Sequence, residues 1–149
     1  MSSDPESASC ESPACRSSPF WSNILQGKPL LAGTACPPGR EALGRATWTF
    51  LHSASLNYPL KPSPEDRRSM QAFLDSFGHV YPCRHCAAHY RGLIKANPPR
   101  VDSREQLAVW VCEIHNSTNE SLGKPKFDCS FSALEKRWRY NPECEDPEL

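Results

Sequence analysis

The chain has 149 residues, the length of a single domain, and its 17 basic side chains balance its 17 acidic ones. Without net charge or a block rich in Lys or Arg, the composition gives no reason to expect binding to nucleic acid or to an anionic membrane. No apolar run approaches the roughly 18 residues of a membrane span, and neither a signal peptide nor an Arg-rich presequence is recognisable, so we expect no membrane segment.

The eight cysteines are unusual for a chain of this length. Thiols in the cytosol are kept reduced, and disulfides are rare there. The cysteine content therefore indicates either an oxidising compartment or a metal-binding protein.

Composition divides the chain into short tails and a longer folded part. Seven of the first eighteen residues are Ser, and Pro recurs through the same stretch. Such a segment buries too little apolar surface to offset the entropy lost on ordering. We therefore expect a flexible tail over residues 1–35 with Cys10 and Cys15 in it, a domain over residues 36–144, and a second tail over residues 145–149.

Apolar residues recur at helical spacing from Arg40 onward and predict a first helix that ends before Pro59. Its expected core face consists of Leu43, Thr47, Phe50, Leu51, Ala54 and Tyr58. A second helix should begin at Pro64, because Ser63 is a good N-cap, Pro suits the first turn and acidic residues follow at the positive end of the helix dipole.

Three further helices follow in the prediction. The third should cover residues 83–96, because an Asn-Pro-Pro sequence stops it. The fourth should begin after Ser103, which forms a capping box with Gln106, and end at Gly123, where a left-handed residue closes a helix. A short fifth should span residues 131–138. With no convincing strand and no repeat, the sequence predicts an all-α bundle of four helices with a short fifth.

Cys83 and Cys86 stand three residues apart at the predicted start of the third helix. The missing N–H of Pro82 costs nothing at a helix edge, and the positive pole of a helix lowers the pKa of a thiol placed there. Two such sulfurs can close a reactive disulfide or bind a metal, so the motif alone leaves a structural zinc site open.

The fourth helix places Cys112, His115, Asn116 and Asn119 on one polar face, with Trp110 beside it. A solvated face would explain four polar residues, but such a face usually carries Lys and Glu, and Asn is a poor helix former. We therefore expect this face to bind something polar, with Trp110 in a position to pack against a flat ring.

The first helix carries Gly44, Trp48 and His52 one turn apart. Gly inside a helix costs about 1 kcal/mol relative to Ala and is tolerated where a neighbour must come close. That neighbour could be another helix or the ring of a ligand. Three cations at helix or loop edges could meet phosphates or could be ordinary surface charges: Arg40, Lys124 and Arg137.

The remaining cysteines suggest structural bridges. A bond between Cys112 and Cys129 would fasten the fifth helix to the fourth, and a loop of that size contributes about 3 kcal/mol in the chain-entropy model. Cys36 precedes the bundle and Cys144 follows it, so this pair could join the two ends of one chain or two subunits.

Four segments taken together resemble one protein family. They are CPPGREALGRATWTFLH at residues 36–52, YPCRHCAAHY at 81–90, WVCEIHNSTNESLGKPKFDC at 110–129 and Arg-Trp at 137–138. This combination is far more specific than an isolated Cys-x-x-Cys motif. Over residues 36–144 the chain resembles the FAD-linked sulfhydryl oxidases of the augmenter-of-liver-regeneration family.

The resemblance implies a compact helical bundle with FAD bound at one end, and an FAD-dependent thiol oxidase that makes disulfide bonds in protein substrates. Cys83 would be the interchange sulfur of the redox-active pair, and Cys86 the flavin-proximal, charge-transfer sulfur. No metal is implied. The implied FAD site has Arg40 at its edge and contains Gly44, Trp48, His52, His89, Cys112, His115, Asn116, Asn119, Lys124, Phe127, Arg137 and Trp138.

The resemblance also implies an assembly and partners. Cys36 would bridge to Cys144 of the partner subunit in a homodimer, and Cys10 with Cys15 would form a shuttle disulfide. The dithiol substrate would be the disulfide carrier of protein import in the mitochondrial intermembrane space. Electrons would pass on to oxygen or to cytochrome c.

The chain departs from the family's pattern in two places. Four residues separate Cys10 from Cys15, where mitochondrial members have two between the shuttle cysteines. The pair His89-Tyr90 is closer to the plant and secretory branches. The cytosol or the secretory pathway is therefore the alternative location.

Two other functions are compatible with parts of the pattern. A zinc-binding interaction module could use Cys83, Cys86 and His89 with Cys112 or His115, but zinc has no use for the Asn-rich face. A disulfide-stapled structural or growth-factor-like protein would explain the outer cysteines but not a Cys-x-x-Cys motif in a polar pocket. A yellow protein with flavin absorption would distinguish the oxidase from both.

Overall fold

The computed structural model describes residues 38–139, and every regular element in that range is a helix. The elements are α3 (Arg40–Asn57), α4 (Pro64–Val80), α5 (Arg84–Ala96), α6 (Arg104–Ser121) and α7 (Phe131–Trp138). This confirms the predicted all-α class. The predicted tails lie outside the described residues, and so do four of the cysteines: Cys10, Cys15, Cys36 and Cys144.

Local sequence explains where the helices begin and end. The capping box at α4 is present, since Ser63 Oγ accepts from the N–H of Asp66 at 3.1 Å and Asp66 accepts from the N–H of Ser63 at 2.8 Å. At α6 only half of the predicted box forms. Ser103 Oγ accepts from the N–H of Gln106 at 3.2 Å, but within residues 38–139 the exposed Gln106 side chain makes no return bond. Gly123 ends α6 with a positive φ of 65°, as the sequence predicted.

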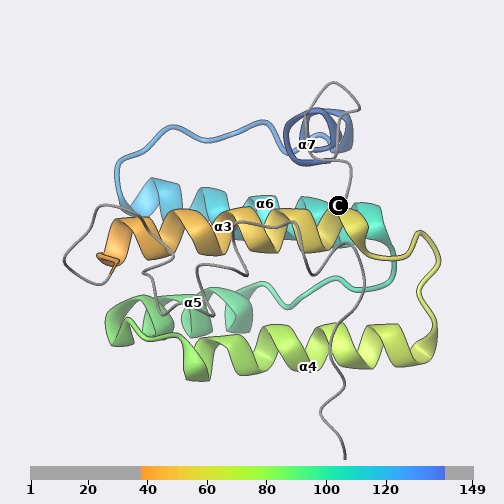
Figure 1. Ribbon diagram of the computed structural model, residues 1–149, viewed down its shortest axis with the longest axis horizontal. Coiled ribbons are helices and arrows are strands. Elements are labelled where there is room, and N and C mark those ends of the chain that lie inside the picture. The colour runs from red at the N-terminus through yellow and green to blue at the C-terminus, as the bar shows by residue number, and fades with distance from the viewer. Residues whose placement is uncertain (1–37, 140–149) are drawn as a thin grey trace, which may run out of the picture. The chain divides into compact units, whose positions relative to one another are not determined.

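The four long helices form two antiparallel pairs, α3 with α6 and α4 with α5, and α7 crosses on the outer side of α3 and α6 (Figure 1). Contacts between α5 and α6 join the two pairs into one bundle. The start of α3, the end of α6 and the start of α5 therefore lie at the same end of the bundle (Figure 1). Among the described helices, none is long and apolar enough to cross a membrane.

The core is built around α6. Leu107, Trp110 and Ile114 of this helix are each no more than 2% exposed, and they pack with residues of α3, α4 and α5. A second cluster forms under α7, where Leu134 packs against Cys112 and its neighbours. The Nε1 of Trp110 donates to the Asn97 carbonyl oxygen at 2.9 Å, which satisfies its one polar atom. Trp110 is therefore a core residue and not one that packs against a ligand ring.

Phe50 is also placed differently from the prediction. The sequence put it on the core face of the first helix, but its side chain is 57% exposed. Because α6 and α7 both pack on α3, that helix buries Leu51 and Leu56 and turns Phe50 outward. The Phe50 ring meets Phe73 of α4 edge to face, with 6.0 Å between the ring centroids.

Candidate active site

The Cys-x-x-Cys motif lies at the start of α5. Cys83 is the N-cap residue, its Sγ accepts from the backbone N–H of Cys86 at 3.3 Å, and the two sulfurs form a disulfide. Both cysteines are partly exposed, and the intervening Arg84 and His85 are exposed. Since α5 contains no Asp or Glu and its positive pole faces the disulfide, the surroundings favour a thiolate when the bond is reduced.

Four rings from three helices stack into a ring cluster of Trp48, His52, His115 and Trp138. Trp48 of α3 lies parallel to His115 of α6, with 4.1 Å between the ring centroids and 6° between the planes. His52 of α3 lies parallel to Trp138 of α7, at 4.5 Å and 1°. A hydrogen bond of 3.0 Å between His52 Nε2 and His115 Nδ1 joins the two stacks.

Burial keeps both imidazoles of the ring cluster neutral. Desolvation first, and then the charges of His115 and Arg137, lower the pKa of His52 to about 3. Desolvation and then Lys124 lower the pKa of His115 to about 4. Near pH 7 neither ring is charged, so in the 3.0 Å pair one nitrogen donates and the other accepts.

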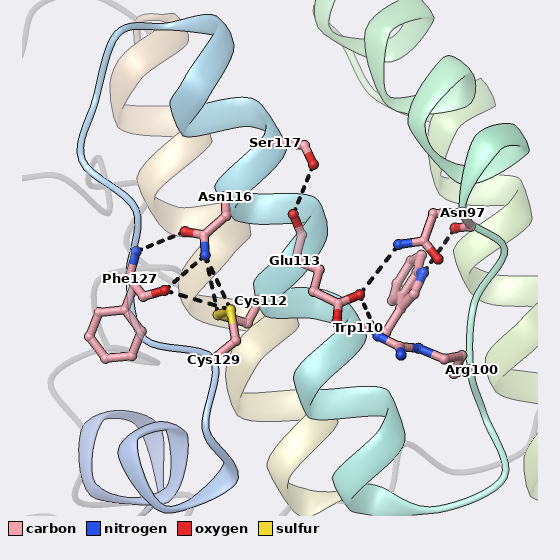
Figure 2. Close-up of polar contacts among 9 residues, drawn as sticks. All are labelled: Asn97, Arg100, Trp110, Cys112, Glu113, Asn116, Ser117, Phe127 and Cys129. Carbon is pink, nitrogen blue, oxygen red and sulfur yellow. Dashed lines mark hydrogen bonds and ion pairs between the residues drawn. A yellow bond between two sulfur atoms is a disulfide. The ribbon is translucent and has the colours of Figure 1, made fainter.

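Asn116 fastens the segment that follows α6 back onto that helix (Figure 2). Its Nδ2 donates to the Phe127 carbonyl oxygen at 2.8 Å, and its Oδ1 accepts from the N–H of Phe127 at 2.9 Å. The Nδ2 also lies 3.2 Å from Sγ of Cys129, which is disulfide-bonded to Cys112. Both ends of this amide are therefore engaged by the chain itself.

Gly44 leaves open space next to the ring cluster. It lies one turn before Trp48 on α3, and a Cβ atom built on it would meet no described atom outside its own helical turns within 4 Å. A closely packed neighbouring helix is therefore not the reason for this glycine. Space for a ligand ring at this position stays a prediction.

The structure brings most of the expected site residues together on α3, α6, α7 and the segment between the last two. The backbone N–H of Lys124 donates to the Asn119 carbonyl oxygen at 2.8 Å, and the guanidinium carbon of Arg137 lies 4.5 Å from the centroid of the Trp138 ring. Together with the stacks and the Asn116 contacts, these interactions join Trp48, His52, Cys112, His115, Asn116, Asn119, Lys124, Phe127, Arg137 and Trp138.

Apart from Gly44, which has no side chain, four expected residues are joined to this group by no hydrogen bond, ion pair or ring stack within residues 38–139: Arg40, Cys83, Cys86 and His89. Arg40 is exposed as the first residue of α3, and His89 is half-buried on α5. The helix starts that carry Arg40 and Cys83 nevertheless lie at the end of the bundle where α6 finishes (Figure 1).

Sequence reasoning missed the polar contacts that fix α5 between its neighbours. Arg91 donates to the carbonyl oxygen of Gly78 in α4. Across the turn between α5 and α6, Glu113 accepts from Arg100 and Asn97 (Figure 2). None of these contacts has a local sequence signal, because tertiary packing brings each pair together.

Within the described range, no three His, Cys, Asp or Glu side chains are arranged to hold a metal ion. Cys83 is bonded to Cys86, and Cys112 to Cys129. The zinc-binding alternative is therefore not favoured, because the sulfurs it needs are paired with one another.

Relatives of known type match most of this chain. The model of the Erv1 / Alr family matches residues 45–139. The mitochondrial FAD-linked sulfhydryl oxidase ERV1 of Saccharomyces cerevisiae is 48% identical over 103 residues, which are 69% of this chain and 53% of that protein. The FAD-linked sulfhydryl oxidase ERV1 of Arabidopsis thaliana is 39% identical over 117 residues, which are 78% of this chain and 60% of that protein. The chain thus spans little more than half the length of these curated relatives.

Solved structures share the fold. The yeast Erv1 core matches with a TM-score of 0.67 and 44% identity, over 73% of this chain and 95% of that one. The FAD-binding domain of Erv1 from Saccharomyces cerevisiae matches with a TM-score of 0.66 and 46% identity, over 69% of this chain and 96% of that one. With a family match over more than half of its length and the same helical fold, the chain belongs to the Erv1 / Alr family.

Proposed function

We propose that this chain is an FAD-dependent thiol oxidase that makes disulfide bonds in protein substrates. The observation that carries the proposal is that the Cys83–Cys86 disulfide lies at the start of α5, at the end of the bundle where α3 begins and α6 ends (Figure 1). The relatives described above are named FAD-linked sulfhydryl oxidases, and a solved neighbour is named an FAD-binding domain.

The residues present fit FAD. Indole and imidazole faces in the ring cluster suit a flat ring, and the neutral imidazoles can donate to or accept from its heteroatoms. Gly44 leaves space that a larger side chain would fill. The cations available to the two phosphates are Arg40, Lys124 and Arg137. The proposed site is completed by His89, Cys112, Asn116, Asn119 and Phe127. Bound FAD would supply an acceptor for two electrons.

In this proposal Cys83 is the sulfur that a substrate thiolate attacks. Its bond to Cys86 breaks, and Cys86 leaves as a thiolate that the start of α5 stabilises. The second substrate thiol then displaces Cys83, which gives one substrate disulfide and two reduced cysteines. Two electrons and two protons have then reached the pair, and Cys86 is the sulfur beside the cofactor.

We further propose that residues 36–144 form the cofactor-binding domain, with Cys112–Cys129 as a structural bond. Asn116 would act on the cofactor through the segment that it positions, because its amide already pairs with Phe127.

A homodimer is the assembly that the exposed apolar face of α3 and α4 favours. Phe50 is 57% and Phe73 37% exposed, and their rings are in contact. A second copy of the same face would bury these rings around a two-fold axis. A bond from Cys36 to Cys144 of the partner subunit would then link the two copies.

Cys10 and Cys15 would carry electrons from a bulky protein dithiol to the motif on α5. The first 15 residues contain three acidic side chains and no Lys or Arg, whereas Arg84 and His85 separate the two cysteines of the motif. Opposite charge would favour the encounter of the two disulfides.

The proposed location is the mitochondrial intermembrane space, with the disulfide carrier of import as substrate and oxygen or cytochrome c as acceptor. Relatives from Saccharomyces cerevisiae and Schizosaccharomyces pombe are named mitochondrial. The eight cysteines also suit an oxidising compartment.

Flavin binding tests the proposal directly. The purified protein should be yellow, and Gly44→Leu should abolish the flavin absorption while leaving the helical circular dichroism intact, because a Cβ atom at this position would meet no described neighbour within 4 Å. Gly92→Leu is the matched control, since Gly92 is a second helical glycine with open space around it and should keep the colour. A wild-type protein that neither contains nor takes up FAD would contradict the proposal.

A further inference from the structure

The end of α4 has a carbonyl group that its own helix cannot satisfy. In a continuing helix the Gly78 carbonyl oxygen would accept from the N–H of residue 82, but Pro82 has no N–H. Arg91 of α5 takes that place and donates from Nη1 to the Gly78 oxygen at 2.5 Å. A guanidinium at the negative end of a helix is also favoured by the helix dipole.

A second hydrogen bond ties the same two helices together one turn earlier. The hydroxyl of Tyr90 donates to the Leu74 carbonyl oxygen at 3.0 Å, and the Tyr90 side chain is 8% exposed. Burial raises the pKa of this phenol well above its usual range, so the donor stays protonated at any physiological pH.

The close approach of α4 and α5 depends on the absence of a side chain at Gly78. A Cβ atom there would lie 2.8 Å from Cγ of Arg91 and 2.9 Å from Cδ1 of Tyr90. Neither atom is the free end of a flexible chain, so α5 would have to move. Gly92 on α5 differs from Gly78, because a Cβ atom built at Gly92 would meet no described atom within 4 Å.

We infer that Gly78, Tyr90 and Arg91 form an interhelix lock that positions the Cys83–Cys86 pair for electron transfer. The side-chain hydrogen bonds of the lock go to Leu74 and Gly78 of α4 and not to the disulfide or the ring cluster, so these three are positioning residues. They act on the pair because only residues 81–83 connect α4 to α5 and because the cysteines lie one to two turns before Arg91 on the same helix. The inference rests on the proposed oxidase function.

The test compares two lock variants with one control. Gly78→Ala and Arg91→Met should slow reduction of bound flavin by a small dithiol about ten- to a hundredfold, since misplacement by about 1 Å can have effects of that size. The affinity for FAD should stay within about twofold, because the proposed cofactor residues lie mainly on α3, α6 and α7. Gly92→Ala should leave both quantities unchanged, and Arg91→Lys, which keeps a cationic donor, should restore part of the rate.

A second readout does not need flavin. In the protein stripped of cofactor, amide hydrogen exchange at Cys86, whose N–H is bonded to the Cys83 sulfur, should accelerate in Arg91→Met and not in Gly92→Ala. An unchanged flavin-reduction rate in both lock variants would overturn the inference. So would parallel losses of rate, FAD affinity and melting temperature, because these would show a purely structural role. If the wild type binds no flavin, the oxidase proposal fails, and the exchange experiment still decides whether the lock holds the cysteine pair.

Discussion

Two neutral imidazoles in direct contact make the ring cluster sensitive to acid. Burial disfavours the protonated form of both His52 and His115, and Lys124 and Arg137 oppose a further positive charge. The family resemblance predicts that both histidines are site residues. The sequence could not reveal that they pair, because they are 63 positions apart and only the packing of α3 on α6 joins them.

Stability should therefore fall as the pH drops below about 6.5. In the unfolded chain both histidines take up protons near 6.5, while in the folded chain they stay neutral down to about 4 for His115 and about 3 for His52. The unfolded state binds more protons in that window, so acid favours unfolding. Urea midpoints across the window should decline less steeply for His115→Gln than for wild type, and exposed His79→Gln should behave like wild type. Identical pH profiles for all three proteins would contradict this account.

Asn116 offers a second test at the residue scale. Asn116→Asp keeps the shape of the side chain but replaces the donating Nδ2 by an oxygen that faces the Phe127 carbonyl and the Cys129 sulfur. We expect a loss of about 1–3 kcal/mol in the free energy of unfolding, together with faster reduction of Cys112–Cys129 in an alkylation assay. The control is Asn57→Asp at an exposed amide, and equal effects of the two substitutions would refute a special role for Asn116.

Among the elements, the boundaries of the helices were predictable and their contact faces were not. Caps and stop signals are local, so Ser63, the Asn-Pro-Pro turn and Gly123 identified helix ends from sequence alone. Which side of a helix is buried depends on its neighbours. For that reason the predicted core position of Phe50 is wrong, and Trp110, which could have packed against a ligand ring, lies in the core.

The charge of α5 leads to a prediction about the tail. A reduced peptide of residues 4–18 should exchange with the Cys83–Cys86 disulfide at a rate that falls with salt, because its acidic side chains approach a helix without Asp or Glu. Arg84→Glu should slow this exchange severalfold. Lys95→Glu changes the net charge equally but lies at the far end of α5, and it should have little effect. Equal rates in both variants would argue against electrostatic docking of the tail.

At the scale of the whole molecule, α3 and α4 share an exposed apolar face that contains Phe50 and Phe73. Ring pairs such as Phe50–Phe73 are costly to leave in water, and the rest of the described core is well buried. Helical spacing predicted the bundle, whereas the set of site residues is what the family resemblance implies. The sequence could not separate inward from outward apolar residues, nor find the lock between α4 and α5.

In a Cys36→Ser background, which removes the proposed covalent link between subunits, Phe50→Glu should therefore convert the dimer into a monomer in sedimentation equilibrium, because it places a charge in the centre of the proposed interface. The helical circular dichroism should not change, since Phe50 is already outside the core. Leu60→Glu is the control at another exposed apolar residue, since Leu60 is 66% exposed. A wild-type protein that sediments as a monomer would contradict the proposed homodimer.

The central claim is that the Cys83–Cys86 pair passes substrate electrons to bound FAD. Anaerobic mixing of the purified protein with a small dithiol tests it most directly, with flavin absorption as the signal. Wild-type protein and the Lys95→Gln control should bleach, whereas Cys83→Ser and Cys86→Ser should retain FAD and bleach at least about a hundredfold more slowly. Bleaching of both serine variants at the wild-type rate would contradict the claim.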